Sequence, residues 1–248
     1  MRNLPLLLAV SGLICSVAQA QIVDYSQNFD SMVVADGSAA DSSLQDGWLV
    51  GANVYNPGGD YLYGYFSFPA PNVGTHFSAV VSGQGGIDQG TNQLSVFSDY
   101  NNSSEHTNGN IVESVVFREY TVGAGNVGET WQFEFDAKLG NLAAPTTALA
   151  FIKTLNPAAG YAQTNFITSD MTAIPTSWGT YQVSLEIDAG LVGQVFQIGF
   201  SNNATNFNSS GVFYDNVNLT VVPEPATYAL LGGLAAIGLV MYRRRKSN

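Results

Sequence analysis

Two stretches of this chain alternate strictly between apolar and polar residues. From Trp131 to Leu139 every second residue is apolar, and Tyr181 to Asp188 repeats the pattern. A period of two is typical of a strand with one buried and one solvated face, and the buried face needs a second layer to cover it. Further candidate strands, separated by Gly, Asn, Asp, Ser and Pro, are residues 61–68, 93–98, 111–122, 148–155, 194–200 and 212–222. We therefore predict an all-β fold, a single antiparallel jelly-roll-like β-sandwich.

The first twenty residues have the three parts of a secretory signal. Arg2 supplies the positive start, residues 4–17 form an apolar stretch that is short for a membrane span, and residues 18–20 read Ala-Gln-Ala. We predict cleavage between Ala20 and Gln21; the alternative is an uncleaved membrane anchor. Cys15, the one cysteine of the chain, lies inside this segment. The mature domain, residues 21–221, must therefore be stabilised by its core and not by disulfides.

The C-terminal segment, residues 222–248, contains an apolar run from 227 to 242 that four basic residues follow directly. Such a run is at the short end of what spans hydrocarbon, and the basic tail would stay cytoplasmic while the domain faces outward. An ordinary stop-transfer anchor would look the same in these respects. What separates the two is Pro223-Glu224-Pro225, a stiff and extended triplet that membrane insertion does not require.

These features together closely resemble the PEP-CTERM sorting signal of Gram-negative bacteria that make exopolysaccharide. The resemblance implies that Pro223, Glu224 and Pro225 are a substrate sequence for an exosortase, a membrane cysteine protease or transpeptidase. It also implies a secreted or cell-surface protein that is transiently anchored in the inner membrane with its domain in the periplasm. Release and covalent attachment are both open as the outcome of processing.

The predicted domain is strongly acidic. It holds three basic residues, Arg118, Lys138 and Lys153, against eighteen acidic ones, so its formal charge is −15. A domain of this charge repels phosphate backbones, which excludes nucleic acid as a partner. Solubility in salt, binding of divalent cations and binding of uncharged glycans all fit such a charge.

A further pattern joins the two ends of the domain. The early stretch is Asn28-Phe29-Asp30, and the late one runs from Phe213 through Asp215 to Val217. These stretches resemble those of galactose-binding-like jelly rolls, a fold of carbohydrate-binding modules. The resemblance implies a structural calcium ion that Asp30 and Asp215 help to hold. Simple alternation places Asp215 on the core side with Val217, where a bare carboxylate is costly and a calcium ion would neutralise it. The alternative is a carboxylate that caps a loop through backbone N–H groups.

A tyrosine stripe, Tyr61, Tyr63 and Tyr65, is the candidate ligand-binding surface. Simple alternation puts the three phenols on one solvent-facing side, with Leu62, Phe66 and Phe68 on a buried side. Exposed aromatic rings suit stacking on sugar rings. The alternative is that loops or a neighbouring strand cover these tyrosines.

One strand is similar to the catalytic strand of laminarinase-type jelly-roll hydrolases. Glu134 and Asp136 match two of its acids, but Lys138 stands where a third acid is needed. Retaining hydrolysis requires two carboxyl groups about 5 Å apart, so we predict no enzyme. The sequence favours an exported protein that binds or associates with exopolysaccharide; the alternatives are a polysaccharide-active hydrolase or lyase and a purely structural matrix protein.

Overall fold

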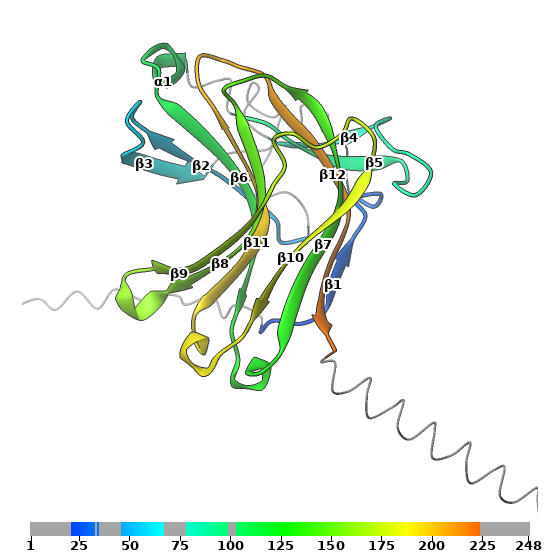
Figure 1. The fold of residues 1–248 in the computed structure, drawn as a ribbon, viewed down its shortest axis with the longest axis vertical. Helices are drawn as coiled ribbons and strands as arrows, with labels where there is room; N and C mark the ends of the chain where they lie inside the picture. Colours follow the sequence, from blue (N-terminus) through cyan, green and yellow to red (C-terminus); the bar gives the residue numbers. More distant parts are fainter. Residues whose placement is uncertain (1–20, 33, 35–45, 67–77, 99–102, 224–248) are drawn as a thin grey trace, which may run out of the picture.

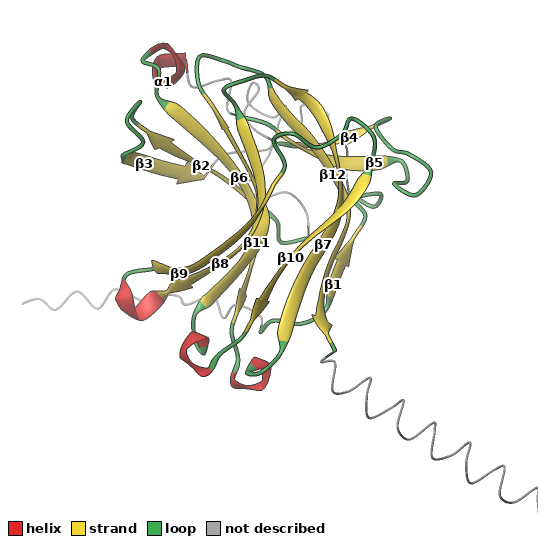
Figure 2. Ribbon diagram, in the orientation of Figure 1, coloured by secondary structure: helices red, strands yellow, loops and turns green. Residues whose placement is uncertain are grey.

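The computed structural model describes residues 21–32, 34, 46–66, 78–98 and 103–223. Their strands form two sheets packed face to face (Figures 1 and 2), and every pairing between strands is antiparallel. The predicted all-β antiparallel sandwich is therefore confirmed.

The first sheet has the strand order β3-β2-β6-β11-β8-β9. In Figure 1 its strands fan out toward the left, with β3 and β2 above and β9 and β8 below. Their bounds are β2 (Leu49–Tyr55), β3 (Tyr61–Phe66), β6 (Ile111–Thr121), β8 (Thr147–Asn156), β9 (Ala162–Asp170) and β11 (Val195–Ala204).

The second sheet has the order β10-β7-β12-β5-β4, and β1 pairs separately with β12. Its strands are β1 (Tyr25–Gln27), β4 (Ala79–Ser82), β5 (Asn92–Val96), β7 (Thr130–Leu142), β10 (Gly179–Glu186) and β12 (Ser210–Val222). The described helices are short: α1 (Ser103–Thr107), η1 (Ala124–Asn126), η2 (Pro157–Ala159) and η3 (Ala189–Leu191).

Aromatic side chains from both sheets fill the space between them. Phe200 of β11 stacks on Tyr214 of β12, with 3.7 Å between ring centroids and 19° between ring planes. The edge of Phe135 from β7 meets Phe200 at 5.1 Å, and Trp48 stacks on Phe200 at 6.1 Å. All four side chains are fully buried. Phe200 is thus the side chain through which the two sheets contact each other most directly.

A short helix lies in the polar stretch before β6. The structure places α1 there and buries His106 completely. The His106 ring lies 4.6 Å from the ring of Phe207. A five-residue helix carries too little periodicity to be read from a single sequence.

The predicted signal peptide (residues 1–20) lies outside the described residues, as do the apolar run at 227–242, Glu224, Pro225 and Phe68. No helix in the described part of the chain has the length and apolar character that crossing a membrane requires.

Truncating Phe200 should cost most of the domain's stability. We expect Phe200→Ala to lower the free energy of unfolding by about 3–5 kcal/mol, because it leaves a cavity between the sheets. Phe66→Ala is the matched control: Phe66 is 65% exposed, so its truncation should cost within about 0.5 kcal/mol. Denaturant unfolding of the two variants measures both effects, and equal costs would contradict this account of the core.

Candidate functional site

The outer face of the first sheet is unusually apolar. On β6 and β8 the residues that alternate away from the core include Val115, Phe117 and Phe151, which form a small buried cluster of their own. Phe117 pairs with Gly199 of β11, and a Cβ added to Gly199 would lie 2.8 Å from that of Phe117. The phenylalanine can therefore cover the central strand because a glycine stands beneath it. Strands with apolar residues on both faces are expected to be covered on both.

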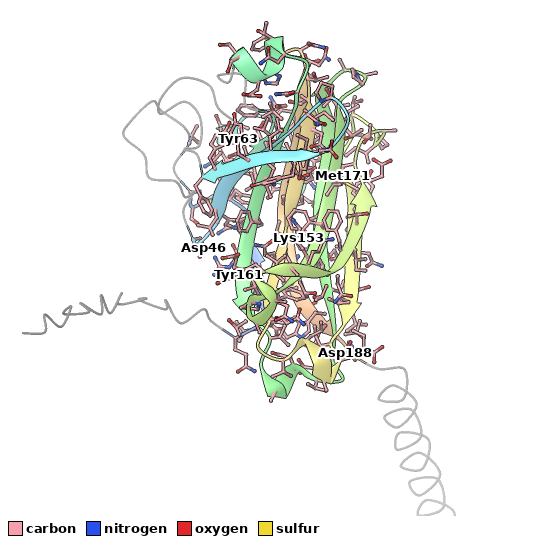
Figure 3. The ribbon with its side chains drawn as sticks, turned by 90° about the vertical axis from the view of Figure 1, so that its left-hand side faces the viewer. Asp46, Tyr63, Lys153, Tyr161, Met171 and Asp188 are labelled. Carbon is pink, nitrogen blue, oxygen red and sulfur yellow. The ribbon has the colours of Figure 1, made fainter. Side chains whose placement is uncertain are left out.

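A groove of about 400 Å³ crosses this outer face. Its lining includes Tyr61 and Phe66 of β3, Phe117 of β6, Gln197 of β11, Lys153 of β8 and Gln163 of β9. It therefore extends from one edge strand of the sheet to the other. Figure 3 looks onto this side of the molecule and shows Lys153 near its middle, between β3 above and β9 below. Small-molecule sites have volumes of roughly 300–1,000 Å³, so the groove has room for a ligand of a few sugar units at most.

The glutamate carboxylates on this face accept hydrogen bonds from uncharged side chains. Glu113 accepts hydrogen bonds from the Asn53 amide (2.7 Å), the Tyr55 hydroxyl (3.2 Å) and the Ser201 hydroxyl (2.9 Å). Burial raises the pKa of Tyr55, and the charge of Glu113 beside it acts in the same direction. Glu119 accepts from the Gln197 amide at 2.6 Å. These bonds fix the side chains that border the groove without using a cation.

The tyrosine stripe is divided between the two faces of the sheet. Tyr63 pairs with Val54, but a bulge follows, and Tyr61 pairs with Tyr55. Tyr61 therefore lies on the groove side, where its hydroxyl reaches over Gly64. Tyr63 and Tyr65 pair with Val54 and Ala52, so their side chains lie on the opposite face, although Tyr65 also borders the groove. The expectation that the three phenols share one face was wrong, because one extra residue in a strand reverses the alternation.

The expected buried side of this strand was also wrong. Leu62 is 47% exposed and Phe66 is 65% exposed. β3 is an edge strand with a neighbour on one side only, so its side chains lack the second neighbour that would cover them. Tyr65 instead packs against Val50 and Ala52 of β2. The part of Tyr63 and Tyr65 in ligand binding stays a prediction.

The two predicted metal ligands lie near each other on the second sheet. Asp30 accepts from the backbone N–H groups of Thr91 (2.7 Å) and Asn92 (2.9 Å). Asp215 accepts from the N–H of Asn216, and its other carboxylate oxygen is buried with no hydrogen-bond partner. Burial is the main cause that raises the pKa of Asp215 to about 7, and the negative charge of Asp30 acts in the same direction.

The expectation that Asp215 lies on the core side of its strand was also wrong. Asp215 pairs with Asp136, on the outer side of β7, and an irregularity in the pairing separates it from Asn218. It therefore faces away from the core that holds Val217, and the stretch between β4 and β5 covers it. Gln89 of that stretch donates to Asp136 (2.8 Å), and the carbonyl of Asp88 accepts from the Asn216 amide (2.9 Å).

An oxygen-coordinated cation fits the pair Asp30 and Asp215, because their two negative charges oppose each other and one buried carboxylate oxygen of Asp215 makes no hydrogen bond of normal geometry, although the Gln93 side chain lies close enough to lower the pKa of Asp215. Within the described ranges no group of three or more His, Cys, Asp or Glu side chains could hold a metal ion. Any calcium here would take its further ligands from carbonyl or amide oxygens or from water. The calcium ion therefore stays a prediction.

The strand that is similar to a hydrolase strand is β7, and its polar side chains form hydrogen bonds within the second sheet and to the loop between β4 and β5. Asp136 accepts from the Thr180 hydroxyl (2.7 Å) and from the amides of Gln89 and Asn216. Glu134 accepts from the Gln132 amide at 3.3 Å, and Lys138 donates to the carbonyl of Gln84 at 2.6 Å. These bonds give the strand a structural role in holding the loop before β5.

Comparison with known proteins identifies the C-terminus. Residues 221–246 match the family model of the PEP-CTERM protein-sorting motif. The chain carries a PEP-CTERM sorting motif. The motif begins in the last two residues of β12 and indicates that this is an exported protein.

Several solved structures are similar to this chain at low sequence identity. The CBM22-1 xylan-binding domain of Xyn10C from Paenibacillus barcinonensis has 10% identity and a TM-score of 0.44, over 84% of this chain and 99% of that one. The Stig cyclase Fisc from Fischerella sp. TAU has 17% identity and a TM-score of 0.48, over 81% and 99%. The tailspike protein 4 domain of bacteriophage CBA120 has 14% identity and a TM-score of 0.44, over 77% of this chain but 21% of the tailspike chain. These structural similarities do not identify an activity for this chain. No curated protein matches the sequence.

Sequence reasoning missed the groove residues Phe117, Gln197, Gln163 and Lys153. One signal was present: residues 111–122 carry apolar residues at Val115, Val116 and Phe117 in succession. Such a run breaks the one-sided pattern and indicates a strand that is covered on both faces.

The calcium prediction can be tested by melting. If calcium binds the folded state alone, a chelator should lower the melting temperature of the full chain; calcium at a hundred times its Kd contributes about 2.7 kcal/mol. Asp215→Asn should remove the difference between chelator and calcium, whereas Glu186→Gln, an exposed acid of β10, should leave it intact. Identical melting of the parent protein in both conditions would leave Asp215 as a loop-capping acid.

Proposed function

We propose that this exported protein binds polysaccharide outside the cell, in the groove across the outer face of the first sheet. The observation that carries the proposal is the composition of that groove: exposed aromatic rings at one edge, amide side chains along it, and an apolar floor. The protein would thereby associate with the exopolysaccharide matrix.

A sugar ring suits such a groove because it has an apolar face and a rim of hydroxyl groups. Tyr61 and Phe66 are 60% and 65% exposed on the same side of β3, and exposed rings of this kind stack on the apolar face of a sugar. The amides of Gln163 and Gln197 can both donate to and accept from hydroxyl groups. The ligand would thus be held by stacking at one end and by hydrogen bonds along its length.

A binding role is favoured over hydrolysis by the spacing of the acids. Glu113 and Glu119 lie on the same face of β6, six residues apart, which corresponds to about 20 Å along a strand. Glycoside hydrolysis needs two carboxyl groups about 5 to 9.5 Å apart. This pair therefore cannot act together on one glycosidic bond.

The sorting motif supports delivery to the matrix. An exosortase of a Gram-negative host would recognise the triplet that begins at Pro223, while the following segment anchors the chain in the inner membrane with the domain in the periplasm. Processing would leave the domain at the cell surface or in the medium. The motif continues directly from β12, so the recognised segment starts where the folded domain ends.

The groove is tested by removing its exposed rings. We expect the double variant Tyr61→Ala/Phe66→Ala of the full chain to bind polysaccharide at least about tenfold more weakly, a loss of ~1.4 kcal/mol. Its stability should change little because both rings are exposed. Affinity electrophoresis against a panel of polysaccharides measures binding, and thermal melting measures stability.

Two control variants test whether the loss of binding comes from the rings in the groove. Ile87→Ala removes a fully exposed side chain in the loop between β4 and β5 and should not change binding. Tyr63→Ala removes a ring from the opposite face of β3 and, if the groove is the site, should also leave binding unchanged. Unaltered binding by the Tyr61/Phe66 variant would refute the groove as the site.

Processing by the exosortase is tested separately by intact mass. Protein recovered outside the native host should begin at Gln21 and lack the segment that follows the Pro-Glu-Pro triplet. A chain outside the cell that still ends at Asn248 would contradict sorting by this route.

A further inference from the structure

The three basic residues of the domain differ in how they are partnered. Arg118 lies 3.7 Å from the Asp46 carboxylate and 4.2 Å from the ring centre of Tyr25. Lys138 donates to the carbonyl of Gln84 at 2.6 Å. For the ammonium group of Lys153, no hydrogen-bond acceptor or ion-pair partner is present among the described residues.

Lys153 lies in the groove, between aromatic rings. Its Nζ atom is 4.8 Å from the ring centre of Phe151 and 5.2 Å from that of Phe166. Burial lowers the pKa of Lys153, and the charge of Glu113 opposes this effect. Cation–π contacts stabilise an ammonium by about 0.5–2 kcal/mol, but they use none of its three N–H donors. A partly desolvated ammonium is thus held without a hydrogen-bond acceptor among the described residues.

The nearby acids form no ion pair with it, although the charge of Glu113 favours its protonated form. The Glu113 carboxylate is occupied by three neutral donors, from Asn53, Tyr55 and Ser201. Glu119 is occupied by the amide of Gln197, the residue that pairs with Lys153 across β11 and β8. The groove of this acidic domain therefore contains one positive group, and the described side chains around it supply no carboxylate that binds it directly.

We propose that Lys153 forms a subsite for an anionic substituent of the bound polysaccharide, a carboxylate or a sulfate. The subsite rests on the proposed function, because it lies in the same groove, and it narrows the ligand to acidic glycans. The negative charge of the domain as a whole repels a polyanion at long range. Affinity for an acidic glycan therefore requires a short-range contact of this kind. Salt screens the attraction between partly buried charges much less than the attraction between exposed charges.

The test compares acidic polysaccharides with their neutral counterparts. Each uronate polymer in the panel is paired with the same polymer after carboxyl reduction, and a sulfated form of the reduced polymer distinguishes sulfate from carboxylate. Titration calorimetry with the full chain should give at least about tenfold tighter binding of an anionic member than of its neutral partner. Lys153→Gln should abolish that difference, because it lowers the affinity for the anionic polymer to that for its neutral partner.

Two variants control for charge and for position. Lys153→Arg keeps the positive charge and should keep the preference, and Lys138→Gln removes a cation from the other sheet and should also keep it. Equal affinity of the parent protein for both members of every pair, or an equal loss for both in Lys153→Gln, overturns the subsite. In either case binding of the neutral polymer still supports the groove, whereas binding of no polymer at all rejects the proposed function itself.

Discussion

The stack of Phe200 on Tyr214 is the contact on which the architecture depends. It joins the middle of the first sheet to the middle of the second at a centroid distance of 3.7 Å. Because the predicted mature domain has no cysteine, the two sheets are held by non-covalent contacts, and this packing is central among them. Burying these rings between the sheets fixes which side of β11 faces inward, and hence which side of the first sheet is left to face outward.

That outward side is shaped by small residues as much as by large ones. Gly199 leaves room for Phe117 to cover β11. Gly64 leaves room for the Asn53 amide and the Tyr61 hydroxyl, which both lie close to it. A side chain at Gly64 would come within 2.7 Å of the Asn53 oxygen. The groove therefore exists because glycines stand where a neighbouring ring or amide crosses the sheet.

The strands could be predicted from the sequence wherever alternation is undisturbed. β7, which includes the stretch from Trp131 to Leu139, is confirmed, because its inward and outward residues differ sharply in polarity. β9 was missed since its sequence, from Ala162 to Asp170, is largely polar with little alternation. Tyr61 was wrongly placed on the same face as Tyr63 and Tyr65, and Asp215 was wrongly placed on the core side, for one common reason: each lies beside an irregularity in strand pairing. A bulge depends on the partner strand as well as on local residues, so a single stretch of sequence does not reveal it.

The candidate site was harder to predict than the fold because its properties depend on distant residues. Lys153 is distinctive through what surrounds it: acids of β6 that are already occupied by Asn53 and Gln197, and rings from β8 and β9. The sorting motif, by contrast, is local and was recognised from its own residues. It continues β12, a strand of the second sheet, whereas the groove opens on the outer face of the first. Attachment through the C-terminal end of β12 would therefore leave the groove, on the opposite sheet, accessible to the proposed polysaccharide ligand.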